Sequence, residues 1–244
     1  MERCDFVNDH LRLIQETDGL TFGTDALLLA GYINGKYRRG CEIGSGSGII
    51  SMLLVTRKKI SSCVALEVQK NYASLTERNV TLNGLGEKIQ TVHTDVRDYN
   101  TDEEFDIVYS NPPYMKTDSG RKNILEKKNI ARHEVCGDIR DFCKAARKML
   151  KFGGCFAAVY RPDRLMDLLS AMRENKIEPK RITFVHADTE SEPSMALIEG
   201  KAGGKCGMLV TRPLIIYTDN AHRDYTADMN YIMENGSFPS AYKR

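Results

Sequence analysis

Several features that would fix a function class at once are missing from this chain of 244 residues. No stretch is long and apolar enough to span a bilayer, and nothing suggests secretion or membrane anchoring. The seven cysteines form no C-x-x-C pair, which argues against a zinc site or a disulfide framework and favours a reducing compartment. We therefore expect a cytoplasmic protein that uses no metal and whose cysteines serve as small buried side chains.

A strong net charge is missing as well. The formal charge of +2 and the pI of about 8.1 are too low to indicate a nucleic-acid-binding protein by themselves. The distribution says more, because basic residues crowd one segment in which only Asp118 and Glu126 oppose them. These basic residues are Lys116, Arg121, Lys122, Lys127, Lys128 and Arg132. We expect this segment to meet a phosphate backbone, as could a second basic run at 201–205 followed by Arg212; a solvated loop is the alternative for both.

Composition and pattern predict one α/β domain without internal repeats or linkers. The content of 41% hydrophobic and 28% charged residues is ordinary for a globular protein with a single core. Strand-like runs alternate with helix-like stretches, which favours a doubly wound sheet. The predicted strands cover residues 40–43, 63–67, 89–94, 105–110 and 155–160, with crossover helices at 71–83 and 139–150. Alternation at 181–187, 194–199 and 214–217 predicts an antiparallel hairpin that closes the sheet.

A glycine-rich turn follows the first predicted core strand, in the run Cys41-Glu42-Ile43-Gly44-Ser45-Gly46-Ser47-Gly48. Glycines allow a tight turn and close backbone approach, and the following helix offers unpaired N–H groups, so the run suits an adenosine-containing cofactor. Glu67 ends the next strand at the offset where an acidic side chain meets ribose hydroxyls in dinucleotide folds. The G-x-G-x-G spacing and the acidic Glu42 favour a cationic sulfonium cofactor over NAD. A Walker loop is excluded because no Gly-Lys-Ser/Thr follows.

Two further motifs follow the third and fourth predicted strands. Asp95 could accept a hydrogen bond from the adenine amino group of such a cofactor, with a turn aspartate as the alternative. The tetrapeptide Asn111-Pro112-Pro113-Tyr114 comes directly after the strand at 105–110. Because the carboxyl ends of parallel strands meet at one edge of a sheet, we expect the glycine turn, Glu67, Asp95 and the tetrapeptide to lie together.

The tetrapeptide matches the chemistry of amino-group methylation. The nitrogen of an adenine amine or a glutamine side chain is a poor nucleophile, because its lone pair is delocalised. The Asn111 side-chain carbonyl and the Pro112 backbone carbonyl can accept the two N–H hydrogens and free that lone pair. The ring of Tyr114 can stack on the planar acceptor and hold it in line with the methyl group. A proline-rich turn after a strand is the alternative.

With these motifs the chain resembles the class I methyltransferases that use S-adenosylmethionine, and within them the family that methylates the 6-amino group of adenine in the anticodon loop of valine tRNA. Further segments extend the resemblance over nearly the whole chain: Phe22-Gly23-Thr24-Asp25-Ala26-Leu27-Leu28-Leu29-Ala30, Ala131-Arg132-His133-Glu134, Tyr160-Arg161-Pro162, and residues 199–201 and 213–217. The resemblance implies a single domain with a Rossmann-like core at 37–244, a mostly parallel sheet of seven strands with an antiparallel closing hairpin, and an N-terminal cofactor and substrate lid at 1–36.

The resemblance also implies roles for single residues. The implied catalytic residues are Asn111, Pro112 and Tyr114. The implied contacts to S-adenosylmethionine come from Thr24, Asp25, Glu42, Gly44, Gly46, Glu67, Asp95 and Asn111, with Thr24 and Asp25 at the methionine end. The implied partner is tRNA, bound by the basic segment after Tyr114. We expect neither a membrane nor a metal as partner, and a monomer or weak dimer.

Other functions remain open on the same residues. A protein-glutamine N5-methyltransferase also uses Asn-Pro-Pro-Tyr, but typically carries a larger helical domain before the core than this chain has residues for. A ribosomal RNA adenine methyltransferase would use the same side chains as the tRNA enzyme. A noncatalytic cofactor-binding module or an NAD enzyme is the last alternative. Methylation of a pyrimidine carbon is disfavoured, because it needs a cysteine nucleophile where this chain has Asn111.

Overall fold

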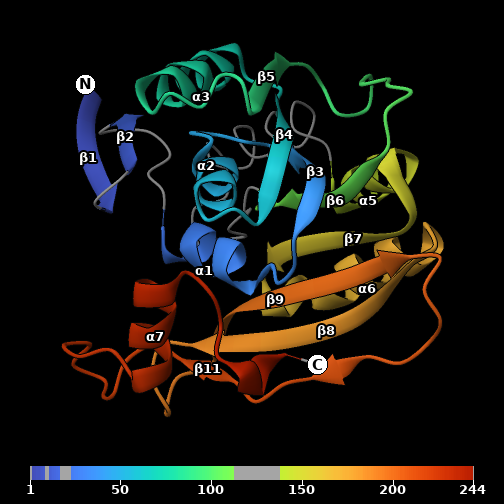
Figure 1. Ribbon diagram of the computed structural model, residues 1–244. Coiled ribbons are helices and arrows are strands. Elements are labelled where there is room, and N and C mark those ends of the chain that lie inside the picture. The colour runs from blue at the N-terminus through green and yellow to red at the C-terminus, as the bar shows by residue number, and fades with distance from the viewer. Residues whose placement is uncertain (1, 9–10, 17–22, 113–137, 244) are drawn as a thin grey trace, which may run out of the picture.

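The computed structural model describes residues 2–8, 11–16, 23–112 and 138–243, in which a central sheet is covered by helices on both faces (Figure 1). In chain order the elements are β1 (Glu2–Asn8), β2 (Leu11–Glu16), α1 (Thr24–Tyr32), β3 (Tyr37–Ile43), α2 (Ile49–Thr56), β4 (Ile60–Glu67), α3 (Lys70–Leu82), β5 (Ile89–His93), β6 (Phe105–Ser110), α5 (Ile139–Met149), β7 (Leu150–Tyr160), η1 (Pro162–Arg164), α6 (Leu165–Glu174), β8 (Ile177–His186), β9 (Pro193–Ala202), β10 (Leu209–Val210), β11 (Leu214–Ile215), α7 (Ala227–Asn235) and η2 (Ser240–Tyr242).

Seven long strands form the body of the sheet in the order β5-β4-β3-β6-β7-β9-β8. β9 runs antiparallel to β7 and β8, whereas the other pairs are parallel. The predicted mostly parallel sheet with an antiparallel closing hairpin is therefore confirmed. The two short strands β10 and β11 extend it beyond β8, and both run parallel to β8. The expectation that 214–217 joins the antiparallel hairpin is wrong, because the chain reverses after β9 and returns alongside β8.

The buried strands carry apolar residues toward both layers of helices. Ile107 and Tyr109 of β6 pack in a core shared with α1, α2 and α7. Val108, between them, packs in a second core shared with α5 and α6. Successive side chains of a strand point to opposite faces, so a strand covered on both sides reads as a continuous apolar run. For this reason the predicted strand at 105–110 has the observed bounds.

Glycine misled the prediction of β7. The predicted helix ends at 150 and the predicted strand starts at 155, because Gly153 and Gly154 are typical of a helix end. The strand instead begins at Leu150, and Gly153 adopts a φ of +75° where the pairing with β6 changes register. Glycine within a strand often marks such an irregularity rather than an end.

The start of α5 is determined by residues close in the chain, because Asp138 and Asp141 form a reciprocal capping box.

The hairpin of β1 and β2 stands apart from the main sheet and packs against α3 (Figure 1). Two side-chain amides of α3 bind the backbone of β2 as a neighbouring strand would. Asn79 bonds both the N–H and the carbonyl of Ile14, at 2.7 and 3.1 Å. Asn83 does the same to Arg12, at 2.9 and 2.7 Å. The hairpin is thus held by specific polar contacts, and its role as a lid stays a prediction.

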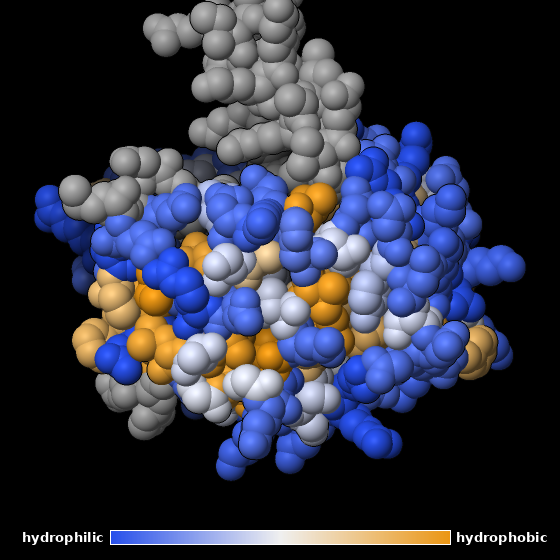
Figure 2. Space-filling view, turned by 90° about the horizontal axis from the view of Figure 1, so that it is seen from above, coloured by the Kyte–Doolittle hydropathy of each residue, from blue (hydrophilic) through white to orange (hydrophobic). Residues whose placement is uncertain are grey.

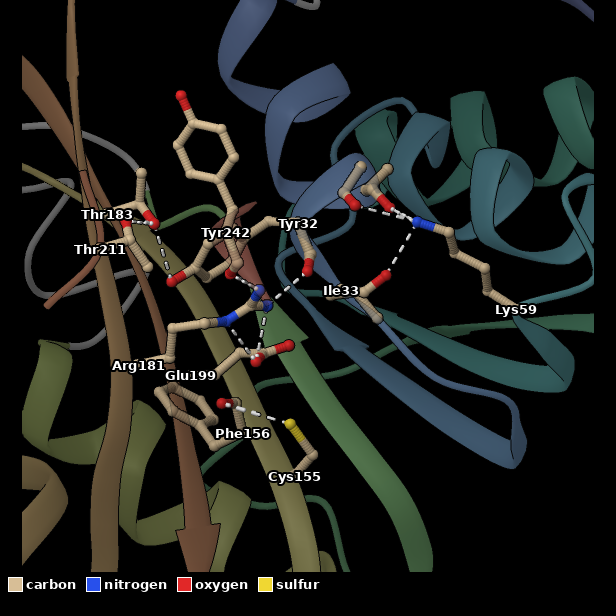
Figure 3. Close-up of polar contacts among 12 residues, drawn as sticks. Tyr32, Ile33, Lys59, Cys155, Phe156, Arg181, Thr183, Glu199, Thr211 and Tyr242 are labelled. Carbon is tan, nitrogen blue, oxygen red and sulfur yellow. Dashed lines mark hydrogen bonds and ion pairs between the residues drawn. The ribbon is translucent and has the colours of Figure 1, made fainter. Parts of the chain in front are cut away.

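A polar cluster is buried beside the carboxyl end of α1 (Figure 3). The guanidinium of Arg181 bonds the carboxylate of Glu199 and donates to the backbone oxygens of Tyr32 and Tyr242, both at 2.7 Å. The Lys59 ammonium donates to the carbonyls of Ala30, Gly31 and Ile33 at 2.7–3.1 Å. The last carbonyls of a helix lack partners within it, so these cations satisfy the end of α1.

The surface seen from above is mainly hydrophilic, with apolar side chains showing between the polar ones (Figure 2). In the part of the chain that the structure describes, no helix is long and apolar enough to cross a membrane. Of the described cysteines, Cys41, Cys63, Cys143 and Cys155 are buried, as expected of small apolar residues, and none forms a disulfide. Cys4 and Cys206 are exposed, contrary to that expectation.

Candidate active site

The predicted motifs lie together at the point in the sheet where the chain stops adding strands on one side and begins to add them on the other. The chain builds β3, β4 and β5 outward on one side, and then crosses to place β6 on the other side of β3. The glycine loop 44–48 leaves the carboxyl end of β3, and Asn111 leaves the carboxyl end of β6, its neighbour in the sheet. In open α/β sheets, ligands bind in the crevice at this topological switch point. The position alone therefore marks a candidate site.

The glycine loop needs its glycines for conformation. Gly44, Gly46 and Gly48 all have positive φ, between +57° and +79°, a region that other residues rarely adopt. A Cβ built on Gly46 meets no atom within 4 Å, so this residue borders open space. Gly48 is the N-cap of α2, which leaves the first N–H groups of that helix directed at the loop. The loop thus provides a backbone cradle over which a ligand can lie.

Glu67 braces this cradle from the end of β4. One carboxylate oxygen accepts from the N–H of Gly46 and the other from the N–H of Gln69, both at 2.9 Å. Burial raises the pKa of Glu67, and these N–H groups partly oppose the rise by favouring the ionised form. The side chain therefore lies beside the glycine loop, where the sequence prediction requires a ribose ligand. That role itself stays a prediction.

Glu42 lies below the loop and is only 1% exposed. Its Oε2 accepts from the N–H of Ser51 at 3.1 Å and from the Ser51 hydroxyl. The Ser51 hydroxyl also lies 2.8 Å from the Tyr109 hydroxyl, and either group can be the donor in that bond. Burial raises the pKa of Glu42 to about 8. The site therefore contains a carboxyl group that is costly to ionise without a nearby positive charge.

Asn111 meets Asp25 of α1 across the crevice. The amide Nδ2 of Asn111 donates to Asp25 Oδ2 at 2.8 Å. The amide oxygen Oδ1 is buried and has no hydrogen-bond partner among the described residues. A buried acceptor without a partner is rare and indicates a place for a donor that arrives with a ligand. Pro112 is buried beside it, and Thr24 is the first residue of α1.

Asp95 shows features of both of its predicted alternatives. It follows β5, next to the end of β4, where the N–H of Thr94 bonds the carbonyl of Glu67 at 2.9 Å. Its carboxylate accepts from the backbone N–H and the guanidinium of Arg97, and this pairing lowers the pKa of Asp95. It is thus a turn aspartate at the expected edge of the sheet, and contact with a cofactor adenine stays a prediction.

Several predicted residues lie outside the described part of the chain: Tyr114, Lys116, Arg121, Lys122, Lys127, Lys128 and Arg132. The second basic run, at 201–205, begins at the end of β9 that pairs with the starts of β7 and β8. It therefore lies at the edge of the sheet opposite Asn111. Its contact with phosphates stays a prediction, and Arg212 is paired with Asp228 at 2.7 Å.

Sequence reasoning missed the polar residues that hold the site together. Thr76 donates to the carbonyl of Gly46 at 2.9 Å, and Asn79 donates to the carbonyl of Ser47 at 3.0 Å. Both are fully buried on α3, spaced three apart on the face that carries its apolar residues. Ser51 is likewise the single polar residue in the apolar stretch 49–55. In each case a polar residue at a position where the helical pattern expects an apolar one was the feature of the sequence that could have identified it.

The residues present suit S-adenosylmethionine better than a phosphate cofactor. The open space over Gly46 admits a ligand against the backbone, where Glu67 bonds the N–H of Gly46, and Glu42 is buried two residues before the glycine turn. A cationic sulfonium and an amino group would favour the ionised form of these two acids, whereas a pyrophosphate would disfavour it. In the described residues, no group of three His, Cys, Asp or Glu side chains gathers to hold a metal ion.

Comparisons with known proteins agree with this geometry. A protein of Parabacteroides distasonis named tRNA1(Val) (adenine(37)-N6)-methyltransferase is 28% identical over 180 residues, which cover 72% of this chain and 75% of that protein. A predicted O-methyltransferase of Agrobacterium tumefaciens superposes with a TM-score of 0.71 at 19% identity, covering 88% and 98% of the two chains. The N-methyltransferase NodS of Bradyrhizobium japonicum, bound to S-adenosyl-L-homocysteine, gives 0.53 at 14%, covering 73% and 84%.

The family comparison covers most of the chain. The methyltransferase small domain matches residues 17–175, from before α1 to the end of α6. This range includes the glycine loop, Glu67, Asp95 and the tetrapeptide. The structural likenesses show the same class I methyltransferase fold. The chain belongs to the methyltransferase small domain family.

Proposed function

We propose that this chain transfers a methyl group from S-adenosylmethionine to the 6-amino group of an adenine in tRNA, the anticodon-loop adenine at position 37 that its relatives' name specifies. The observation that carries the proposal is the Oδ1 of Asn111 at the switch point of the sheet, which is buried and has no hydrogen-bond partner in the part of the chain that the structure describes. An acceptor held there is suited to an N–H group of the substrate. The relatives' name supports adenine in tRNA as the source of that group.

The chain's own residues would act by orientation and hydrogen bonding. Asn111 Oδ1 and the backbone carbonyl of Pro112 accept the two amine hydrogens, which withdraws the nitrogen lone pair from the ring. Tyr114 stacks on the base and aligns it for in-line attack. When bound, S-adenosylmethionine supplies the electrophilic methyl group. No general base is needed, because the methylated nitrogen is strongly acidic and loses its proton to solvent.

The cofactor would lie on the cradle of the glycine loop. Gly44 and Gly46 allow the cofactor to approach the backbone of the loop closely. Glu67 accepts from the ribose hydroxyls with the lone pairs that are left free by its bonds to the N–H groups of Gly46 and Gln69. Glu42 lies beneath and complements the positive charge of the methionine end. Asp95, at the end of β5, accepts from the adenine amine of the cofactor.

The partner in this proposal is tRNA in the cytoplasm, where this substrate is used. The target base lies in an anticodon loop, where it is unpaired and cheap to extrude from its stack. The basic residues between Lys116 and Arg132 would contact the phosphates, which makes binding dependent on salt.

The proposal is tested by incubating the protein with methyl-labelled S-adenosylmethionine and unmodified total tRNA, then digesting the RNA and analysing the nucleosides by mass spectrometry. We expect label in 6-methyladenosine. Label in ribosomal RNA or in a protein glutamine, with none in tRNA, would support amino-group methylation but contradict tRNA as the substrate. Absence of label from every fraction would overturn the proposal.

The tetrapeptide gives the first mutational prediction. Asn111→Ala removes the side-chain acceptor, and we expect kcat to fall about 1000-fold, the size of effect seen when a reaction-site hydrogen-bond partner is removed. Affinity for S-adenosylhomocysteine, measured by calorimetry, should stay within a few-fold. The matched control is Asn235→Ala on α7, which removes only a bond to the Tyr231 carbonyl. Normal turnover by Asn111→Ala would remove the basis of the mechanism.

A further inference from the structure

The contact between Asp25 and Asn111 is the feature of the site that the proposed reaction does not yet use. The two residues are 86 positions apart in the chain, and their side chains meet at 2.8 Å between Asp25 Oδ2 and Asn111 Nδ2. A primary amide has a donor end and an acceptor end of nearly the same shape, so it can occupy its position in two orientations. Only one of them presents the oxygen to a substrate amine.

Asp25 is itself held in a fixed position. It lies in the first turn of α1, where the positive end of the helix dipole favours a carboxylate. Its other oxygen, Oδ1, accepts from the N–H of Ala26 at 2.8 Å. Both oxygens are therefore committed, one to the helix and one to Asn111. An ionised carboxylate can only accept hydrogen bonds, so it selects the NH₂ end of the neighbouring amide.

The rest of the Asn111 environment does not make this selection. Its Oδ1 is buried without a partner among the described residues, so no donor there holds the oxygen in place. Turning the amide by half a revolution would direct Oδ1 at the Asp25 carboxylate, which is repulsive, and would direct the NH₂ group at the substrate amine. The amide would then offer a donor where the reaction needs an acceptor.

We propose that Asp25 is a positioning residue, which fixes the orientation of the Asn111 amide so that its oxygen faces the amine to be methylated. This inference rests on the proposed function of Asn111 as an amine acceptor. Asp25 acts through Asn111 and accepts no proton from the substrate. It differs from the role that the family resemblance implies, in which Asp25 contacts the methionine end of the cofactor.

The two roles predict different kinetics. A positioning role affects kcat and leaves cofactor affinity nearly unchanged, whereas a cofactor ligand affects the binding of S-adenosylmethionine first. Asp25→Asn is the sharpest variant, because the new amide has the same shape but can donate as well as accept, so it no longer selects one orientation. Asp25→Ala removes the partner altogether.

The experiment compares these variants with wild type on unmodified total tRNA. We expect kcat to fall about 100-fold in Asp25→Asn and at least as far in Asp25→Ala, as for a misplaced reacting group. The dissociation constant of S-adenosylhomocysteine should change less than about threefold, well below the loss in kcat. The matched control is Asp167→Asn on α6, also a first-turn helix aspartate, whose side chain is 43% exposed and pairs with Arg164. It should behave as wild type, and thermal melting checks that each variant is folded.

A spectroscopic readout tests the contact without catalysis. In ¹⁵N-labelled protein, the side-chain NH₂ signals of Asn111 are identified by their loss in Asn111→Ala. We expect a downfield proton shift for the N–H bonded to the carboxylate, and its loss in Asp25→Asn but not in Asp167→Asn. Unchanged signals, unchanged kcat, or a loss confined to cofactor affinity would each overturn the inference. If wild type itself methylates no tRNA, the proposed function fails, whereas an active wild type matched by Asp25→Asn defeats only the inference.

Discussion

Two buried carboxylates lie in one row of the sheet and are compensated in different ways. Glu42 pairs in register with Tyr109, Tyr109 with Ala157, and Ala157 with Glu199. The two acids are therefore on the same face, three strand spacings or about 14 Å apart. Glu199 bonds the guanidinium of Arg181, whereas Glu42 forms no ion pair with any described cation and bonds only Ser51.

The difference distinguishes Glu199, a structural carboxylate, from Glu42, a carboxylate of the candidate site on the same face of the sheet. Around Glu199, the guanidinium of Arg181 pairs with the carboxylate and satisfies the carbonyls at the ends of α1 and η2, although Glu199 Oε1 is buried without a hydrogen-bond partner among the described residues (Figure 3). The negative charge of Glu199 is therefore compensated without a ligand. Around Glu42, burial raises the pKa to about 8, so its ionisation awaits a positive charge from outside the chain. The sulfonium of the proposed cofactor provides such a charge.

The largest effect is expected where the compensated pair is broken. Arg181→Met leaves Glu199 without its cation and removes donors from the carbonyls of Tyr32 and Tyr242. We expect a loss of about 3–5 kcal/mol in the free energy of unfolding, measured by urea denaturation. Adding Glu199→Gln should recover part of it, because the uncompensated charge is then gone. A loss below about 1 kcal/mol would mean that the pair does not compensate the buried charge.

A smaller effect is expected at the second buried cation. Lys59→Met removes the donor from three carbonyls at the end of α1, which should cost about 2 kcal/mol. Burial lowers the pKa of Lys59 to about 7 from 10.5, so the folded protein binds fewer protons than the unfolded chain between these values. Wild-type stability should therefore rise relative to the variant as pH increases from 7 to 10. Exposed Lys88→Met is the control, and a pH-independent difference would contradict the assignment.

A pH-dependent effect of the opposite sign is expected at Glu42. Its folded pKa of about 8 exceeds the ordinary 4.5, so the folded protein retains a proton that the unfolded chain loses in this window. Wild-type stability should thus fall as pH rises from 4.5 to 8 and level off above. Glu42→Gln, which keeps an acceptor for Ser51, should equal wild type in stability at pH 4.5 and exceed it at pH 9 by up to about 5 kcal/mol, the size that such a pKa shift implies. A Glu42→Gln protein less stable than wild type at pH 9 would show that Glu42 needs its charge in the free protein. Exposed Glu87→Gln is the control.

Prediction from sequence was strongest for features that depend on near neighbours in the chain. The strand at 105–110 and the glycine turn were both recognised from local pattern, and the positive φ angles at Gly44, Gly46 and Gly48 explain why glycine is required there. Prediction failed where pairing set the geometry. Gly153 continues a strand instead of ending a helix, and β11 runs parallel to β8 instead of joining the antiparallel hairpin.

The sequence by itself determined the succession of strands and helices along the chain, the glycine loop and the acceptor tetrapeptide. These follow from apolar periodicity and from residue chemistry over a few positions. Only the tertiary structure decided which distant groups meet. It brings Asp25 to Asn111, joins Ile14 to Ser47 through Asn79, and buries Glu42 without an ion pair to any described cation. These contacts depend on sheet register and helix packing, and burial then sets the charge of each group. No local pattern encodes them.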